Sequence, residues 1–232
     1  MRTYKIFLIR HGLTSANFEG KYIGNTDLDL CEQGVTELIS LMEEFEYPNV
    51  GRVYTSPLKR AIQTARLIYP QMTPVTVDNL REYSFGEFEN KTMQELDGTE
   101  KFVQWVQSNQ EITPDGGEKM SDFKKRVVKG LDSVIRDMMK DQVSEAALVT
   151  HAGVIMSLLA LCGLPKRLPL EWAVESGKGY TLMINASLWG NNNSFEVFTP
   201  IPYGSDKENI MLDYQRELEL DEEIDIDYEI EE

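Results

Sequence analysis

The chain has 232 residues, of which 41% are hydrophobic and 27% charged, a composition typical of a globular domain with a sizeable core. The formal net charge is −16, so the excess of lysine and arginine that nucleic-acid binding requires is absent, and we expect no nucleic-acid partner. The first apolar run, residues 6–9, is too short for a signal peptide or a membrane span. We therefore expect a cytoplasmic protein without a membrane partner, in which Cys31 and Cys162 are reduced thiols used in packing.

The first predicted strand leads to the first candidate site. Four apolar residues, Ile6 to Ile9, indicate a strand buried on both faces, as in the centre of a parallel sheet. The strand ends at Arg10, His11 and Gly12. In open α/β sheets ligands bind beyond the carboxyl ends of the strands, so these residues lie where chemistry is expected. Gly12 would let the backbone turn sharply and approach a ligand closely.

The following segment predicts a loop, two helices and a second arginine near the same edge of the sheet. Residues 20–34 are polar and turn-rich, and residues 35–45 have apolar side chains at helical spacing. A short strand at 53–55 leads into a helix with Ser56 as N-cap and Pro57 as first helical residue. Arg60 would then lie in the first helical turn, where backbone N–H groups favour anions.

Residues 75–140 predict a further strand and several helices. A short strand is expected at 75–77, and residues 92–115 indicate short helices and a loop in which Phe102, Trp105 and Val106 are packing positions. A turn at residues 114–118 breaks the chain, and an apolar stripe from Met120 to Met138 indicates a long helix.

A second buried strand carries a second histidine. Residues 146–150 end in His151, Ala152 and Gly153, so this strand would deliver His151 to the edge of the sheet where His11 lies. A helix is expected at residues 154–162. Residues 180–184 and 195–198 then predict a hairpin around residues 190–193.

The C-terminal 27 residues differ in composition from the rest. Residues 206–232 contain thirteen acidic residues against Lys207 and Arg216. Their last part alternates isoleucine or tyrosine with acidic residues, which is strand periodicity with a charged outer face. This acidic extension would add a strand to its own sheet or to a partner's, giving a homodimer, or would form a disordered arm. We expect a domain boundary at residue 205.

The motifs, in this order, resemble the histidine phosphatase superfamily, also called phosphoglycerate mutase-like proteins. The resemblance covers residues 4–160 or so and rests on Arg10-His11-Gly12 with Thr14 and Asn17, a loop with Gly24, Asp27, Leu30 and Gly34, residues 56–65, Leu80-Arg81-Glu82 with Phe85-Gly86, and Thr150-His151-Ala152-Gly153. It implies a three-layer α/β/α sandwich with a mostly parallel central sheet. The alternation of predicted strands and helices indicates the same α/β class.

The side chains in these motifs suit cleavage of a phosphomonoester. Arg10 and Arg60 can each bind phosphate oxygens through two N–H groups. A neutral His11 can attack phosphorus to form a phosphohistidine, and His151 can donate to the oxygens as charge develops. The resemblance points to Glu82 as the acid that protonates the leaving alkoxide and later takes a proton from water. For that role its pKa has to be raised by burial or by nearby phosphate.

Other residues near these motifs leave alternatives open. Glu87 and Glu89 lie close to Glu82 in the sequence and compete with it for the role of the acid. Asn17 could support the phosphate site or, with Thr14, cap a helix. Ala152 would bind substrate through its backbone N–H. No cofactor and no metal site are expected, since the chain has no metal-ligand spacing of cysteine or histidine.

The resemblance favours hydrolysis over transfer of the phosphoryl group. Phosphoglycerate mutases of this superfamily have Arg-His-Tyr after the acid, whereas Tyr83-Ser84-Phe85-Gly86 follows Glu82 here. Residues 101–118 are more similar to the α-ribazole phosphatase and broad-specificity phosphatase branch, although Lys119 stands where that branch often has a small hydroxyl residue. The alternatives are a mutase and a non-catalytic binding module that uses the acidic extension.

Overall fold

The computed structural model describes residues 3–108 and 110–204. The central element is a seven-stranded sheet with the order β3-β2-β4-β1-β6-β7-β5. Its strands are β1 (Thr3–Arg10), β2 (Arg52–Thr55), β3 (Val75–Thr76), β4 (Glu145–Thr150), β5 (Gly163–Leu164), β6 (Gly179–Asn185) and β7 (Phe195–Ile201). Most neighbouring strands are parallel, and β6 is antiparallel to both β1 and β7. The sheet is therefore mixed but mostly parallel, as expected.

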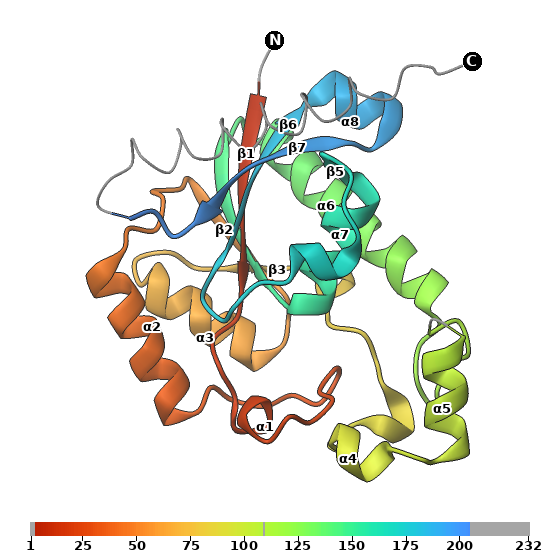
Figure 1. Cartoon of the computed structure of the whole chain (residues 1–232). Helices are drawn as coiled ribbons and strands as arrows, with labels where there is room; N and C mark the ends of the chain where they lie inside the picture. The colour runs from red at the N-terminus through yellow and green to blue at the C-terminus, as the bar shows by residue number, and fades with distance from the viewer. Residues whose placement is uncertain (1–2, 109, 205–232) are drawn as a thin grey trace, which may run out of the picture.

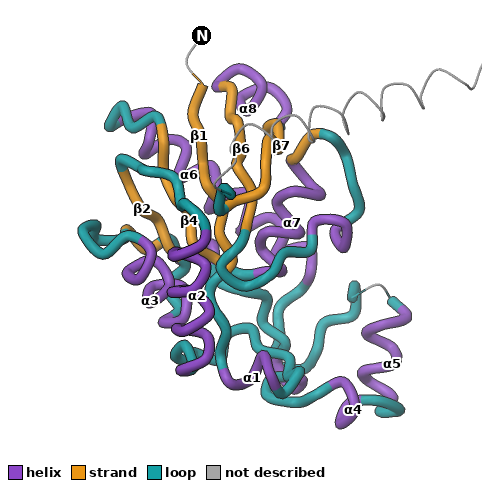
Figure 2. The backbone as a smooth tube through the Cα atoms, turned by 60° about the vertical axis from the view of Figure 1, so that its left-hand side comes forward, coloured by secondary structure: helices purple, strands orange, loops and turns teal. Residues whose placement is uncertain are grey.

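Helices cover both faces of this sheet and give the three expected layers (Figure 1). On one face lie α2 (Glu32–Glu44) and α3 (Lys59–Ile68), and on the other α6 (Met120–Lys140), α7 (Ala152–Cys162) and α8 (Ala186–Asn192). The short helices α1 (Ser15–Phe18), α4 (Met93–Leu96) and α5 (Glu100–Gln107) lie beyond the carboxyl end of β1 in both ribbon views (Figure 2). Single turns of 3-10 helix, η1 (Asp78–Leu80), η2 (Gly86–Phe88) and η3 (Pro169–Trp172), complete the fold.

The alternation of side chains along β1 explains why it is the central strand. Ile6 and Leu8 pack into the core under α6 and α7, whereas Phe7 and Ile9 pack on the opposite face with Ala61 of α3. Successive residues of a strand point to opposite faces, so a continuous apolar run suits a strand that is covered on both sides.

The pairing of β1 with β4 positions both histidines. The two strands run parallel, and Arg10 lies opposite Thr150. The residues that follow, His11 and His151, therefore leave the sheet side by side at its carboxyl edge. The backbone N–H of His11 also donates to the carbonyl of Thr150, over 2.9 Å.

Some expectations about local structure are wrong. The helix expected from Pro57 begins at Lys59, and Leu58 is its N-cap. The Ser56 hydroxyl accepts from the N–H of Leu58, which lies outside the helix, and also contacts the buried His151. The strands β6 and β7 do form an antiparallel pair, but α8 joins them in place of a turn. Val106 is 50% exposed and is not a packing residue.

The two cysteines have different surroundings. Cys162 is a buried free thiol, as expected, whereas Cys31 is the N-cap of α2, with a sulfur that accepts from the N–H of Gly34. Among residues 3–108 and 110–204, no helix is both long and apolar enough to cross a membrane.

The predicted strand in the acidic extension lies outside the described residues.

Candidate active site

His11 is buried at the carboxyl end of β1, and its two ring nitrogens have distinct partners. Nδ1 lies 2.6 Å from the carbonyl oxygen of Gly12, and the Nε–H of Arg60 donates to Nε2 over 3.2 Å. A carbonyl can only accept and a guanidinium can only donate, so the proton is on Nδ1 and the lone pair on Nε2. Burial and the nearby Arg60 hold the pKa of His11 well below its usual range, so the imidazole is neutral.

Gly12 serves packing and turn geometry. Its N–H donates to the hydroxyl of Thr64 over 2.9 Å, which fixes the turn after β1 against α3. A Cβ at this position would lie 2.5 Å from Cδ1 of Leu38. The close approach expected of Gly12 is therefore to a core leucine of α2.

Arg60 lies in the first turn of α3, as predicted, and is only 1% exposed. Besides His11, its guanidinium donates to the carbonyls of Thr26 and Gly24, over 2.9 and 2.8 Å. These bonds use three of its five N–H groups and leave two without a partner among the described residues. Burial lowers the pKa of Arg60, and the carboxylate of Glu82 opposes this shift, so the group stays cationic.

Glu82 is 7% exposed, and its carboxyl group lies at the first turn of α7. Its Oε1 accepts from the N–H of Tyr83 and its Oε2 from the N–H of Gly153, over 2.8 and 2.9 Å. Burial raises the pKa of Glu82, although these two hydrogen bonds and the charge of Arg60 act against the rise. A raised carboxyl pKa is what a proton donor near neutral pH requires.

His151 follows β4 directly and is the N-cap of α7. It is fully buried, and its ring centroid lies 5.0 Å from that of His11 in an edge-to-face arrangement. Its Nε2 lies 2.7 Å from the hydroxyl of Ser56, whereas its Nδ1 is buried with no hydrogen-bond partner among the described residues. Burial and the charge of Arg60 hold the pKa of His151 well below its usual range.

The remaining candidate residues lie at the same edge of the sheet and differ in how many of their N–H groups already have a hydrogen-bond partner. Arg10 donates from Nη1 to the carbonyl of Val174 over 2.6 Å, and its buried Nε has no partner within the described part of the chain. The side-chain oxygen of Asn17 accepts from the N–H and the hydroxyl of Thr14, both over 2.9 Å, which leaves its amide NH₂ available. Ala152 is the first residue of α7, so its N–H has no acceptor within the helix.

The two competing glutamates have other roles. Glu87 pairs with Lys101 on the surface. Glu89 accepts backbone hydrogen bonds from the loop at residues 24–26 and from Phe85. Among the three glutamates, only Glu82 is buried, so the geometry favours Glu82 as the proton donor.

Sequence reasoning missed Arg126 and Glu118, which hold the backbone at Glu82. Arg126 of α6 donates to the carbonyls of Arg81 and Glu82, over 2.6 and 2.9 Å, and forms a two-pronged ion pair with Glu118. The helical spacing of Phe123, Val127 and Leu131 predicts which face of α6 is buried. In that pattern Arg126 cannot be told apart from the other polar residues of the helix. Its long-range partners, 44 to 47 residues away, are not visible in the sequence.

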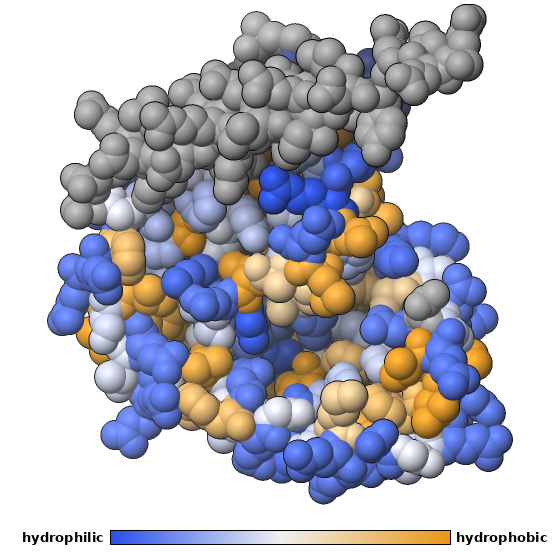
Figure 3. Space-filling model, viewed as in Figure 1, coloured by the Kyte–Doolittle hydropathy of each residue, from blue (hydrophilic) through white to orange (hydrophobic). Residues whose placement is uncertain are grey.

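The surface is hollowed on the face shown in Figure 3, with hydrophilic residues deep in the recess and hydrophobic residues on its rim. Beside Glu82 a cavity of about 540 Å³ is lined by Asn25, Arg81, Ser84, Thr113, Gly116, Gly117, Glu118, Lys119, Asp122 and Arg126. Neither Arg81 nor Lys119 has a side-chain partner within residues 3–108 and 110–204, and both side chains are exposed.

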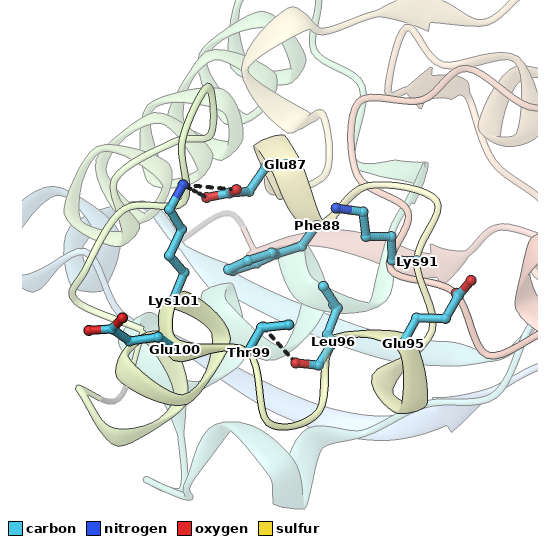
Figure 4. A pocket seen from close by; sticks show the side chains of 8 residues that line it. All are labelled: Glu87, Phe88, Lys91, Glu95, Leu96, Thr99, Glu100 and Lys101. Atoms are coloured by element: carbon cyan, nitrogen blue, oxygen red, sulfur yellow. Dashed lines mark hydrogen bonds and ion pairs between the residues drawn. The ribbon is translucent and has the colours of Figure 1, made fainter.

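A second hollow, of about 320 Å³, lies between η2, α4 and α5 and is lined by Glu87 among others (Figure 4). Its Lys101 is paired with Glu87, as the close-up shows, and also with Asp115. Neither this hollow nor the cavity of about 540 Å³ is lined by His11, Arg60 or His151. These side chains meet at the carboxyl edge of the sheet, where we place the candidate active site. Within the described residues, no group of three or more His, Cys, Asp or Glu side chains is arranged to hold a metal ion.

Comparisons with known proteins agree with this geometry. The model of a family described as histidine phosphatase superfamily (branch 1) matches residues 6–189. The chain is 28% identical over 186 residues to the adenosylcobalamin/alpha-ribazole phosphatase of Escherichia coli, covering 78% of this chain and 90% of the relative. It is also 28% identical over 191 residues to the glucosyl-3-phosphoglycerate phosphatase of Mycolicibacterium vanbaalenii, covering 77% and 82%.

Solved structures give the same result. The crystal structure of the alpha-ribazole phosphatase from Shigella flexneri matches with a TM-score of 0.68 and 28% identity, and the match covers 78% of this chain and 91% of that one. The resemblance and the fold predicted from the motifs are confirmed.

Proposed function

Because the chain belongs to the histidine phosphatase superfamily, branch 1, we propose that it hydrolyses a small phosphomonoester with His11 as nucleophile and Glu82 as proton donor. Its family and its phosphatase-named relatives make it a phosphoric monoester hydrolase that works through a phosphohistidine. The observation that carries the assignment of His11 is its protonation: the imidazole is neutral, with the lone pair on Nε2.

In the first step, Nε2 of His11 attacks phosphorus and the bond from phosphorus to the ester oxygen breaks. Arg60 donates to this lone pair in the structure, so a bound phosphoryl group has to take over that N–H before His11 can attack. The free N–H groups of Arg10 and Arg60 then neutralise the phosphoryl oxygens. Glu82 gives its proton to the leaving alkoxide and becomes a carboxylate.

In the second step, the Glu82 carboxylate takes a proton from water, whose oxygen attacks phosphorus. The bond from phosphorus to Nε2 breaks, and inorganic phosphate and neutral His11 are restored. The same residue therefore serves as acid and then as base, and its raised pKa suits both directions of proton transfer.

His151 would stabilise the phosphoryl oxygens through Nδ1. The Ser56 hydroxyl oxygen accepts from the N–H of Leu58 over 3.3 Å, so its own proton is free to be donated to Nε2 of His151. That bond favours the tautomer with the proton on Nδ1, the buried atom that lacks a partner among the described residues. A neutral His151 can then donate to phosphate without a change in its charge. Asn17, through its amide NH₂, and Ala152, through its N–H, would add two more donors.

The cavity beside Glu82 is the place for the alcohol part of the substrate. Its lining includes the exposed cations Arg81 and Lys119 and the acidic residues Glu118 and Asp122. Such a mixed lining suits a small polar alcohol. We further propose, as the sequence predicts, a cytoplasmic protein that does not bind nucleic acid. Of the arrangements that the sequence leaves open for residues 206–232, we propose the one that forms a homodimer. Deletion of these residues with a measurement of the mass in solution tests the dimer.

Phosphate release from p-nitrophenyl phosphate in the presence of EDTA, with wild type and His11→Ala side by side, tests the proposed function. Loss of the nucleophile should reduce turnover about a thousandfold or more. Comparable turnover in His11→Ala would refute the assignment of the nucleophile. A parallel reaction with 3-phosphoglycerate distinguishes a mutase, which would form 2-phosphoglycerate faster than inorganic phosphate.

A further inference from the structure

The carboxylate of Glu89 is surrounded by five hydrogen-bond donors. It follows η2, is half-buried, and its two carboxylate oxygens accept from four backbone N–H groups and one hydroxyl. The donors are the N–H groups of Gly24, Asn25, Thr26 and Phe85 and the Thr26 hydroxyl, at 2.6 to 3.3 Å. An ionised carboxylate has about four lone-pair positions, so this one is saturated.

The loop held by Glu89 is the one that orients Arg60. Gly24 and Thr26 turn their N–H groups to Glu89 and their carbonyls to the guanidinium, which donates to them over 2.8 and 2.9 Å. The third guanidinium contact is Nε2 of His11. A continuous series of hydrogen bonds therefore runs from Glu89 through the loop and Arg60 to the nucleophile.

The close packing of this loop leaves little room for an alternative arrangement. A Cβ on Gly24 would lie 1.7 Å from the carbonyl oxygen of Tyr83 and 2.6 Å from Oε1 of Glu89. The charge of Glu89 is also among those that oppose the effect of burial on the pKa of Arg60. Glu89 therefore acts on Arg60 both through the loop geometry and through its charge.

We propose that Glu89 is a positioning residue that orients Arg60 for binding of the phosphoryl group. This inference rests on the proposed function, because Arg60 has this task only if phosphate binds between it and His11. The number of donors also distinguishes Glu89 from Glu82: each oxygen of Glu82 accepts a single N–H, whereas five donors surround the carboxylate of Glu89.

Substitution of Glu89 by Gln tests the proposal, with Glu87→Gln as the matched control. Glutamine keeps the shape of the side chain but turns one oxygen into an NH₂ group that faces N–H donors. A misplacement of about 1 Å at a reacting group can cost about a hundredfold. Glu89→Gln should therefore lower kcat/KM on p-nitrophenyl phosphate about ten- to a hundredfold and weaken inhibition by inorganic phosphate. Glu87→Gln, which removes charge from a surface ion pair, should change either value less than about threefold.

A double-mutant cycle with Arg60→Ala separates positioning from general stabilisation. If Glu89 acts through Arg60, Glu89→Gln should change kcat/KM less than about twofold once Arg60 is absent. Equal effects in both backgrounds, or an unchanged inhibition constant for phosphate in Glu89→Gln, would overturn the proposal. Should Glu89→Gln fold poorly, Thr26→Val removes one donor to Glu89 and leaves the carbonyl that Arg60 uses. It should act in the same direction, and again only in the presence of Arg60.

Failure of the proposed function would look different. In that case His11→Ala would retain turnover, whatever the result for Glu89. Loss of turnover in His11→Ala together with full additivity in the cycle would leave the nucleophile in place and refute the role of Glu89 alone.

Discussion

Gly153→Ala should impair proton transfer by Glu82 with little effect on folding. Gly153 is the second residue of α7, and its N–H donates to Oε2 of Glu82 over 2.9 Å. A Cβ at this position would lie 2.5 Å from Oε1 and 3.0 Å from Cδ of the same carboxyl group. Ordinary van der Waals contact begins at about 3.4 Å, so the carboxyl group has to move by roughly 0.9 Å.

The expected loss in rate follows from this displacement. A shift of about 1 Å in a reacting group can cost about a hundredfold, and general acid catalysis itself contributes about 10²–10⁴-fold. We therefore expect kcat/KM for an alkyl phosphate to fall about a hundredfold. For p-nitrophenyl phosphate, whose leaving group needs no proton, the fall should be less than about tenfold. Alanine is the better helix former by up to about 1 kcal/mol, which offsets part of the steric cost to stability.

The assay compares both substrates in wild type, Gly153→Ala and the control Gly190→Ala. Gly190 lies in α8, where an added Cβ would have no atom within 4 Å, so its substitution should leave both rates unchanged. Equal losses on the two substrates in Gly153→Ala would refute the reasoning, because they would indicate damage to phosphate binding. A fall in the unfolding temperature large enough to depopulate the folded state would have the same effect.

Three further predictions concern the pH profile, His151 and the alcohol cavity. Burial raises the pKa of Glu82, and the protonated form is the active acid, so kcat/KM for an alkyl phosphate should fall as pH rises through that pKa. Glu82→Gln should lack this fall over the same pH range. Ser56→Ala removes the donor that favours the Nδ1–H tautomer of His151, so kcat should drop about tenfold with a smaller change in KM, and an unchanged kcat would contradict the tautomer assignment. Lys119→Ser should raise KM about three- to tenfold for phosphomonoesters whose alcohol carries a carboxylate and leave KM for neutral alcohols unchanged, which a paired substrate panel measures.

The sequence predicts the strands that position the candidate site residues more reliably than the hydrogen bonds that orient their side chains. The buried runs before His11 and His151 indicate two neighbouring strands, and their parallel register follows from the α/β pattern. Local rules fail at Ser56, which has the residue type and position of an N-cap but contacts a histidine 95 residues away. The role of Glu89 is not visible in the sequence for the same reason: apart from Phe85, its partners lie 63 to 65 residues earlier, in a loop without periodicity.

The position of β1 between β4 and β6 has a consequence for the order in which the protein forms. Both neighbours of β1 in the sheet, Glu145–Thr150 and Gly179–Asn185, come much later in the chain. Contacts between segments so distant in sequence carry a large loop-closure cost and form slowly. During synthesis the apolar residues of β1 therefore remain unpaired until β4 and β6 have been translated. The approach of His11 to His151 thus depends on the late pairing of β1 with β4.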